Sequence, residues 1–296
     1  MTDRAFRYAA DCGKTTLYKF RAYQTKEQRD WVREILVDHK VYFSRASQLN
    51  DPFDLTPRLQ TATRETLLAG ARDYFKRRGT RKLEAAAKLL YLKTCDLAAH
   101  LQKAEARMRQ RIEEHYWVFS LAGNRDHPML WSHYADKHTG LCIHFRADQK
   151  SVFCASLEVI YDDARPELPV ELYTLPEHEV WRRATLMKGK FWQYEDEFRW
   201  VRAPDIDYSD LPLRFNGQHA FFPPPILSGV TLGARMPDSD IKELLALAAA
   251  HVPPLPVWRA RESRGFTFDF ESINGQAIRS PPPCESATPG PTGVNT

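Results

Sequence analysis

The spacing of hydrophobic residues changes along this chain of 296 residues, and the changes separate helical segments from strand-like ones. Apolar side chains recur every three or four residues over 27–39, which predicts an amphipathic helix. From about 63 to 114, the high content of Ala, Leu, Lys and Arg predicts two or three more helices, broken near Gly79. Shorter helices are predicted over 128–136, 177–191 and 238–251.

Short apolar or alternating segments fill much of the remaining chain and predict strands. They lie at 17–21, 40–44, 116–121, 140–145, 157–161, 197–201, 226–232, 255–261 and 266–270. Because no regular helix follows each strand, this order predicts an α+β fold with a mixed, mostly antiparallel sheet. We expect one domain over 1–279 with a helical insertion at about 58–115. A disordered tail is expected at 280–296, where Pro, Ser, Gly and Thr dominate.

Composition places the chain among ordinary globular proteins, with 43% hydrophobic and 27% charged residues. No apolar run approaches the roughly 20 residues that a membrane-spanning helix needs. The N-terminus also lacks a charged-then-apolar secretion signal. We therefore expect a cytoplasmic protein that has no membrane partner.

Positive charge is concentrated in the helical insertion. The segment 58–115 holds 14 Lys and Arg against 7 Asp and Glu, a net charge of +7, while the whole chain carries +4. The remaining residues therefore sum to −3. Such a basic segment suits an acidic protein or a nucleic acid as a partner, although a solvated helix face has the same composition.

Two acidic residues in the motif Tyr-Glu-Asp-Glu-Phe-Arg-Trp are the first candidates for chemistry. On a strand, Glu195, Glu197 and Arg199 would share one face, with apolar residues behind them. A carboxylate near the anomeric carbon of a sugar stabilises the positive charge that develops when its bond breaks. A second carboxylate can orient or deprotonate the attacking group. The alternative is a pair of acids held in ion pairs with neighbouring cations.

An early strand at 17–21 offers cations for an anionic ligand. Tyr18 and Phe20 would lie on one face, with Lys19 and Arg21 on the other. The planar fork of an Arg side chain suits a phosphate or carboxylate group. An edge strand with solvated cations would have the same pattern.

A turn-rich loop at 48–54 follows the strand that ends at Ser44. Asn and Asp before Pro commonly brace a turn through side-chain bonds to the backbone. A loop so well specified at the end of a strand could also form the wall of a pocket. Ser44 is therefore included among the candidate binding residues.

The densest group of functional side chains runs from Trp131 to His138. At helical spacing, Trp131 and Tyr134 share a face that could stack on a planar ring, and His133 points elsewhere. Core packing of the two aromatic rings is the competing interpretation. His133, Asp136 and His138 do not match a known helical metal motif, so we expect no metal site.

In this order, these segments resemble the bacterial domain-of-unknown-function family 2971. The likeness spans about Leu17 to Phe270, and its most specific part is the block Trp131-Ser132-His133-Tyr134. The other segments that carry it are 17–21, 41–44, 50–54, 118–121, 138–143, 192–199 and 229–233. The biochemistry of that family is not well established, so the resemblance implies no activity.

A second resemblance is to the Arg, Ser and Glu-x-Glu series of ADP-ribosyltransferases. It implies that Arg21 contacts the phosphates of a dinucleotide, that Ser120 supports the nicotinamide ribose, and that Glu197 directs transfer. Two departures are visible: Ser-Leu-Ala stands where that superfamily has Ser-Thr-Ser, and a helical insertion separates the first two motifs.

We therefore predict a nucleotide-dependent transferase that uses NAD, with a role in phage defence or stress. Glu197 would stabilise the developing ribosyl cation and Glu195 would orient the acceptor. A ring of Trp131 or Tyr134 would lie near the nicotinamide cation. The residues expected to bind the cofactor are Tyr18, Arg21, Ser44, Ser120, Trp131, His133 and Tyr134.

Two other classes of function stay open at this point. A non-catalytic sensor would use the same pocket to recognise a ligand or protein, while the basic helices contact a partner. A nuclease is suggested only by the basic segment 58–115, and the sequence lacks the clustered carboxylates that two-metal chemistry needs.

Overall fold

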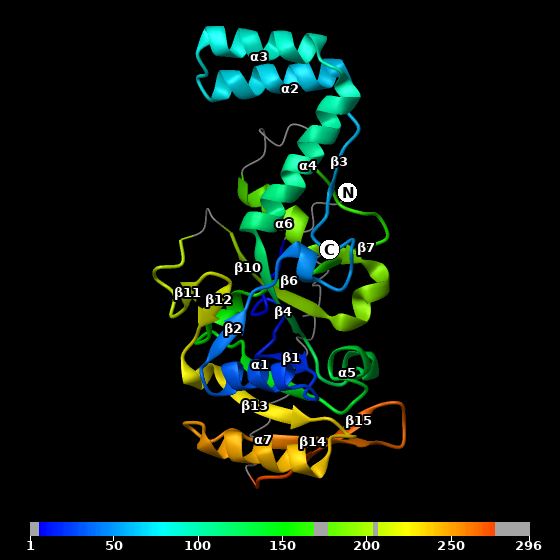
Figure 1. Ribbon diagram of the computed structural model, residues 1–296, viewed down its shortest axis with the longest axis vertical. Coiled ribbons are helices and arrows are strands. Elements are labelled where there is room, and N and C mark those ends of the chain that lie inside the picture. Colours follow the sequence, from blue (N-terminus) through cyan, green and yellow to red (C-terminus); the bar gives the residue numbers. More distant parts are fainter. Residues whose placement is uncertain (1–5, 169–176, 204–206, 276–296) are drawn as a thin grey trace, which may run out of the picture.

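A central sheet of eight strands organises the fold (Figure 1). The computed structural model describes residues 6–168, 177–203 and 207–275. The predicted tail at 280–296 therefore lies outside the described residues. Within them, the combination of helices and sheet confirms the predicted α+β class.

The strands of the central sheet come from both ends of the chain. Their spatial order is β15 (Phe268–Ser272), β14 (Val257–Glu262), β13 (Leu227–Leu232), β5 (Leu141–Arg146), β1 (Thr16–Arg21), β4 (Trp117–Ala122), β10 (Glu197–Arg202) and β6 (Leu157–Glu158). Neighbouring strands are antiparallel except β13 and β14, which are parallel. The sheet is therefore mixed and mostly antiparallel, as predicted.

Three smaller sheets are formed by short strands outside the central sheet. One has the order β11 (Arg214–Asn216), β12 (His219–Phe221) and β2 (Lys40–Tyr42). The others pair β3 (Arg58–Leu59) with β8 (Glu167–Leu168), and β7 (Ile160–Asp162) with β9 (Met187–Gly189). Short 3₁₀ helices lie between them: η1 (Ala46–Gln48), η2 (Val152–Ala155), η4 (Lys190–Glu195) and η5 (Pro224–Ile226).

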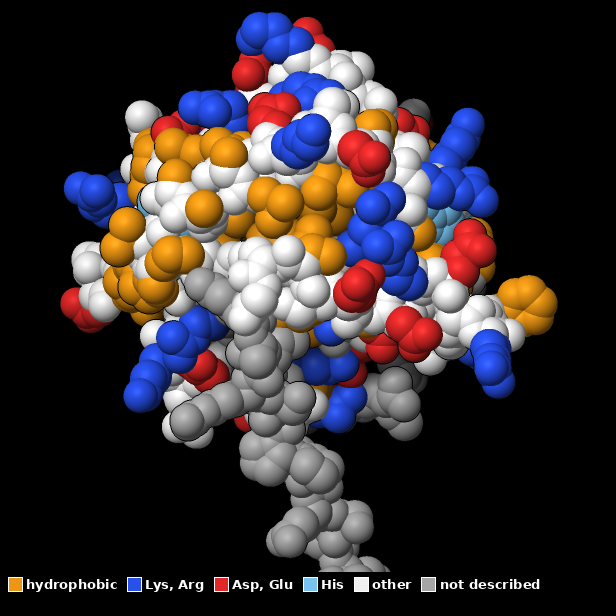
Figure 2. Space-filling view, turned by 90° about the horizontal axis from the view of Figure 1, so that it is seen from below, with side chains coloured by type: hydrophobic (Ala, Val, Ile, Leu, Met, Phe, Trp, Pro, Cys, Tyr) orange, Lys and Arg blue, Asp and Glu red, His pale blue; other side chains and the backbone are white. Residues whose placement is uncertain are grey.

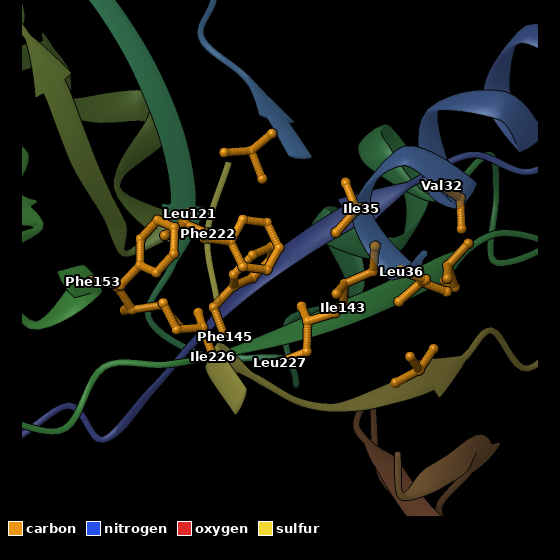
Figure 3. Close-up of a cluster of buried hydrophobic side chains, with 14 of the residues drawn as sticks. Val32, Ile35, Leu36, Leu121, Ile143, Phe145, Phe153, Phe222, Ile226 and Leu227 are labelled. Carbon is orange, nitrogen blue, oxygen red and sulfur yellow. The ribbon is translucent and has the colours of Figure 1, made fainter. Parts of the chain in front are cut away.

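The described α-helices cover the sheet or extend from it. They are α1 (Lys26–Leu36), α2 (Arg64–Arg77), α3 (Lys82–Thr94), α4 (Leu97–His115), α5 (Pro128–Tyr134), α6 (Glu177–Thr185) and α7 (Asp238–Ala250). Helix α1 begins with a capping box, in which Thr25 and Gln28 satisfy each other's backbone N–H groups. It presents Val32, Ile35 and Leu36 to the largest hydrophobic core (Figure 3).

Two apolar layers enclose the central strands. On one side, Ile143 and Phe145 of β5 pack in the same cluster as α1 and Phe153 (Figure 3). A separate, smaller cluster contains Trp131 of α5 and Cys142 of β5. Because successive strand residues point to opposite faces, a strand such as β5 that is buried on both sides is apolar almost throughout.

Helices α2, α3 and α4 form the predicted helical insertion. The α2–α3 hairpin lies far from the central sheet, at the end of the long helix α4 (Figure 1). It has a small core of its own around Leu67, Leu68 and Leu92. The hairpin is thus held together largely by local contacts.

The predicted helix 177–191 is wrong in its second half. Helix α6 ends at Thr185, and the chain continues as strand β9, which pairs in parallel with β7. Gly189 then precedes the 3₁₀ helix η4. Glycine is a poor helix former, and backbone pairing with β7 stabilises the extended alternative. This change of structure brings Lys188 into the interior.

The β11–β12 hairpin was not predicted. Its turn consists of Gly217 and Gln218, between the paired residues Asn216 and His219, and Gly217 has a positive φ of 57°. Gly at the first central position of a two-residue turn is a signal for a tight hairpin. The signal was present in the sequence, but the flanking strands are only three residues long.

Hydrophobic side chains reach the surface in separate patches at the end of the molecule that carries α7 and β14 (Figure 2). Charged side chains lie between these patches (Figure 2). Phe266, in the β14–β15 turn, is fully exposed. Across the described part of the chain, every helix is too short or too polar to cross a membrane.

Candidate functional site

The central sheet opens between β1 and β4, and a pocket occupies the opening. Strand β1 pairs with β5 over six residues but with β4 only at Tyr18 and Ala122. Beyond that pair, side chains fill the space between β1 and β4. Lys19 Nζ of β1 donates to the carbonyl of Ser120 on β4 at 2.7 Å. The cavity volume is about 330 Å³, near the lower end of the range for small-molecule sites.

Segments far apart in the sequence supply the walls of this pocket. Besides β1 and β4, they are helix α1, the loop at 44–54, helix α5 and the chain from β9 to β10. The lining side chains that these four segments supply include Gln28, Trp31, Ser44, Asn50, Asp54, His133, Tyr134, Lys188, Glu195 and Glu197. The pocket therefore depends on the complete fold of the body.

Glu195 and Glu197 meet at one cation, although Glu195 does not lie on the strand. It ends the 3₁₀ helix η4, and Asp196 has a left-handed φ of 44°, so β10 begins at Glu197. The predicted strand alternation is thus wrong at Glu195. Lys188 Nζ nevertheless lies 2.5 Å from Glu195 Oε2 and 3.1 Å from Glu197 Oε2. Both carboxylates are buried in the pocket wall.

A buried arginine fixes the position of Glu197. Arg199 Nε donates to Glu197 Oε1 at 2.7 Å, and its Nη2 donates to Oε2 at 2.9 Å. The same guanidinium binds both oxygens of Asp54, at 2.8 and 2.5 Å. Such bidentate pairs hold a carboxylate in a defined orientation. The ion-pair interpretation of the Glu-x-Glu motif is therefore correct as a description of its contacts.

The two carboxyl groups have different proton affinities. Burial alone would raise the pKa of Glu197, but the charges of Arg199 and Lys188 lower that pKa far below its usual value. For Glu195, burial is the dominant influence and raises the pKa despite the opposing charge of Lys188. The surroundings thus shift the pKa values of the two carboxyl groups in opposite directions. Such separation is typical of acid–base pairs with distinct roles.

Tyr134 connects helix α5 to the acidic pair. Its hydroxyl donates to Glu195 Oε1 at 2.5 Å and accepts from Asn50 Nδ2 at 3.1 Å. Burial, followed by the charge of Glu195, raises the pKa of Tyr134. The phenol therefore stays protonated and acts as a hydrogen-bond donor to the carboxylate.

The opposite wall is cationic. Burial, followed by the charge of Arg21, lowers the pKa of Lys19 to about 7. Burial also lowers the pKa of Arg21 to about 10. Arg21 Nε has no hydrogen-bond partner within the described residues. That Nε atom is buried, but Arg21 lines the pocket, and its planar guanidinium group suits an anionic ligand.

The structure brings together most of the side chains singled out from the sequence. Those that line the pocket are Tyr18, Arg21, Ser44, Ser120, His133, Tyr134, Glu195 and Glu197. Their presence around one cavity agrees with a shared site but does not assign a role to any of them. Arg21 of β1 and the acidic pair of the η4–β10 segment thus line the same cavity.

Trp131 is the exception, because it lies in the core. Its side chain has 0% exposure, and its ring packs edge to face on Phe20 with ring centroids 5.0 Å apart. The indole Nε1 donates to the carbonyl of Arg125 at 2.7 Å. The ring has no open face for a ligand, which corrects the predicted stacking role. Tyr134 is the aromatic residue of this helix that reaches the pocket.

The comparisons with known proteins identify part of this chain. Residues 130–200 match the family DUF2971, described as a protein of unknown function. This match confirms the predicted family resemblance for that segment. No curated protein and no solved structure matches the chain. The likeness to ADP-ribosyltransferases therefore stays a prediction.

The DUF2971 segment supplies part of the pocket lining. His133, Tyr134, Lys188, Glu195 and Glu197 all lie within the matched residues. The cations of β1 and the loop at 44–54 come from outside it. Glu195 and Glu197 thus belong to the family segment, whereas Asp54, Lys19 and Arg21 come from the N-terminal part of the chain.

Sequence reasoning missed two important members of the site. Lys188 was assigned to the interior of a helix, so its position opposite the acids could not be foreseen. Asp54 was interpreted as part of a turn, whereas it binds Arg199 from a distance of 145 residues along the chain. The density of polar residues in the Asn-Asp-Pro-Phe-Asp motif was the only signal for this contact.

Among the residues that the structure describes, no group of three or more His, Cys, Asp or Glu side chains is arranged to hold a metal ion. The three acids Asp54, Glu195 and Glu197 instead face the cations Lys188 and Arg199. The site therefore combines a cationic wall with an acidic wall whose carboxylates are held in ion pairs.

Proposed function

We propose that this pocket binds NAD and transfers its ADP-ribosyl group to an acceptor. The observation that carries the proposal is the arrangement of opposite charges across one cavity. Arg21, with an unpartnered Nε, lies on one wall, and the acidic pair Glu195 and Glu197 lies on another. NAD has the matching polarity, since its pyrophosphate is anionic and its nicotinamide ribose becomes cationic during cleavage.

The cationic wall would hold the pyrophosphate. Arg21 can offer its planar fork to phosphate oxygens. Lys19 lies beside it on β1 and adds a second positive charge when it is protonated. Ser120 is close to Lys19, because its carbonyl already accepts from Lys19 Nζ. This assignment supports the phosphate role that the resemblance implies for Arg21.

The acidic wall would act on the ribose. In the proposed step, the bond between ribose C1′ and the nicotinamide nitrogen breaks, and nicotinamide leaves as a neutral base with the bonding electrons. The ionised Glu197 would stabilise the cation that develops at C1′. The acceptor then attacks C1′, and its proton passes to Glu195, whose raised pKa suits a base.

The dimensions of the pocket favour the nicotinamide half of the dinucleotide inside it. A cavity of about 330 Å³ is small for an entire NAD molecule. The adenosine half would lie at the mouth, which includes Gln28 and the half-exposed ring of Trp31. An indole face can stack on a base. Trp31 therefore replaces Trp131 as the tryptophan available to the nucleotide.

The direct test is release of nicotinamide from NAD by the purified full-length protein. Glu195→Gln keeps the shape of the side chain and removes the base, so we expect the rate to fall about 100-fold or more. Glu271→Gln is the matched control, because it alters an exposed carboxylate paired with Arg261 and should leave the rate unchanged. An equal rate in Glu195→Gln and wild type would remove this residue from the reaction.

A second function is favoured by one specific observation. Both acids of the pair form ion pairs with Lys188, and Glu197 also pairs with Arg199. A non-catalytic nucleotide sensor would need carboxylates held rigidly in this way and would need no free base. It would show saturable stabilisation by NAD in a thermal melt with no release of nicotinamide, whereas turnover would exclude this alternative.

A further inference from the structure

Helix α3 carries two apolar rows on different faces. The inner row contains Leu89 and Leu92, which pack with Leu67 and Leu68 of α2. The outer row contains Leu83 and Leu90, whose side chains are 85% and 62% exposed. Monomeric proteins seldom expose several large apolar side chains on one helix face. Packing within the hairpin core therefore does not explain why the outer row is apolar.

The outer row has the spacing of a helix–helix contact. Leu83, Ala87, Leu90 and Thr94 are separated by four, three and four residues, and all are exposed. This is the interval at which side chains of one helix fit between those of another. The small Ala87 lies between the two leucines and leaves space for a side chain from outside. A helix with apolar rows on two faces is typical of a position between two other helices.

The charge around this row identifies the kind of partner. The hairpin 64–94 contains nine Lys and Arg against three Asp and Glu, a net charge of +6. Lys82 and Lys93 fall beside the outer row at helical spacing. Glu84 is already paired with Lys88 at 2.6 Å. A partner with acidic residues beside its own apolar row would complement this surface.

We propose that the outer face of α3 docks an acidic amphipathic helix of another protein, which completes a three-helix arrangement with α2 and α3. A second copy of this chain fits poorly, because each hairpin would bring a charge of +6 to the contact.

Other classes of macromolecule fit less well than a helix. Phosphate backbones are bound by cations and aromatic rings, and exposed leucines at helical spacing serve no purpose there. An anionic bilayer needs a broad apolar face, whereas this row is one leucine wide and is interrupted by alanine. The hairpin also lies beyond the body of the protein, where a partner can reach it (Figure 1).

The test uses a designed peptide as the probe. Its helix would carry Leu and Ala at heptad spacing, with Glu on both flanks and a fluorescent label. We expect the full-length protein to bind it with an affinity that falls as salt rises. The double variant Leu83→Gln/Leu90→Gln should weaken binding by about tenfold or more, with an unchanged melting temperature because both side chains are exposed. Phe266→Gln, at a fully exposed site on the opposite end of the molecule, should bind normally.

Several results would overturn the proposal. They are absence of binding by the wild-type protein, equal binding by the double variant, and equal binding of a peptide in which Lys replaces Glu. Binding to phosphatidylserine vesicles that the double variant loses would identify a membrane surface instead. Concentration-dependent dimerisation lost in the double variant would identify a second copy of the chain.

Discussion

The pocket and the α2–α3 hairpin both depart from the usual placement of charged residues outside and apolar residues inside, each in a different way. The pocket buries charge: Arg199 has no exposed surface and binds two carboxylates in the interior. The hairpin exposes apolar surface, with Leu83 and Leu90 directed to solvent. Charged groups are rarely buried without a partner, and large apolar groups seldom gather on the outside. We therefore propose that both regions are binding sites, one for a small ligand and one for a macromolecule.

The two regions also differ in how they are held together. The pocket is built from segments spread between β1 and β10, so its geometry depends on the whole sheet. The hairpin depends mainly on contacts between α2, α3 and the start of α4. We expect a destabilising substitution in the pocket to lower the stability of the whole sheet, and one in the hairpin to affect only the hairpin. The predictions below test this difference.

The largest effect is expected from removal of the buried cation. Arg199→Met leaves Asp54 and Glu197 without their principal partner, which should lower the free energy of unfolding by about 3–5 kcal/mol. Glu105→Gln breaks an exposed i,i+4 pair with Arg109 on α4 and should cost less than about 0.5 kcal/mol. Denaturant unfolding of both variants checks the prediction. Similar losses in the two variants would contradict the distinction between buried and exposed pairs.

A core substitution in the hairpin should have a large but local effect. Leu92→Ala truncates a buried leucine of the small hairpin core and should cost about 2–5 kcal/mol there. Hydrogen exchange should quicken in α2 and α3 but not in β1 or β4, and NAD affinity should be unchanged. Faster exchange in the central sheet would show that the hairpin and the body unfold together.

The sequence predicted most of the secondary structure but missed contacts between segments that lie far apart in the chain. Most helices and strands follow from their own periodicity, as α1 and β10 do. The cation Lys188 was missed because β9 forms through pairing with β7, a contact that no local pattern encodes. Trp131 and Tyr134 share a helix and a face by spacing, yet one is core and the other reaches the pocket. Only the packing of α5 on β1 decides between them.

Ligand affinity should depend on pH through Lys19. Its pKa of about 7 in the free protein means that it is positively charged below this pH and neutral above it. An anionic ligand favours the charged form and raises the pKa, so affinity for NAD should fall as the pH rises above about 7. The decrease approaches tenfold per pH unit at most.

The control for this effect is Lys19→Met, which removes the titrating group. Its NAD affinity should be weaker than wild type at pH 6 and nearly constant up to pH 8.5. Calorimetric titrations of both proteins at several pH values provide the measurement. The same slope in the variant would assign the pH dependence to another group.

A smaller effect is expected at Tyr134. Tyr134→Phe keeps the ring but deletes the hydroxyl that donates to Glu195 at 2.5 Å. Loss of one hydrogen bond to a charged group costs about 1.5–3 kcal/mol in the site. Nicotinamide release should therefore slow by roughly tenfold or more, and its pH profile should shift upward, because Glu195 loses a donor that lowers its pKa. An unshifted profile would separate Tyr134 from the titration of Glu195.

The central claim is that the opening between β1 and β4 is a nucleotide site whose phosphate end is Arg21. The measurement that tests it most directly is calorimetric titration of NAD into wild type and Arg21→Met, with Arg261→Met as the exposed control. We expect one saturable site in wild type and the control, and at least about tenfold weaker binding in Arg21→Met. Saturable binding of equal strength in all three proteins, or none in wild type, would contradict the account.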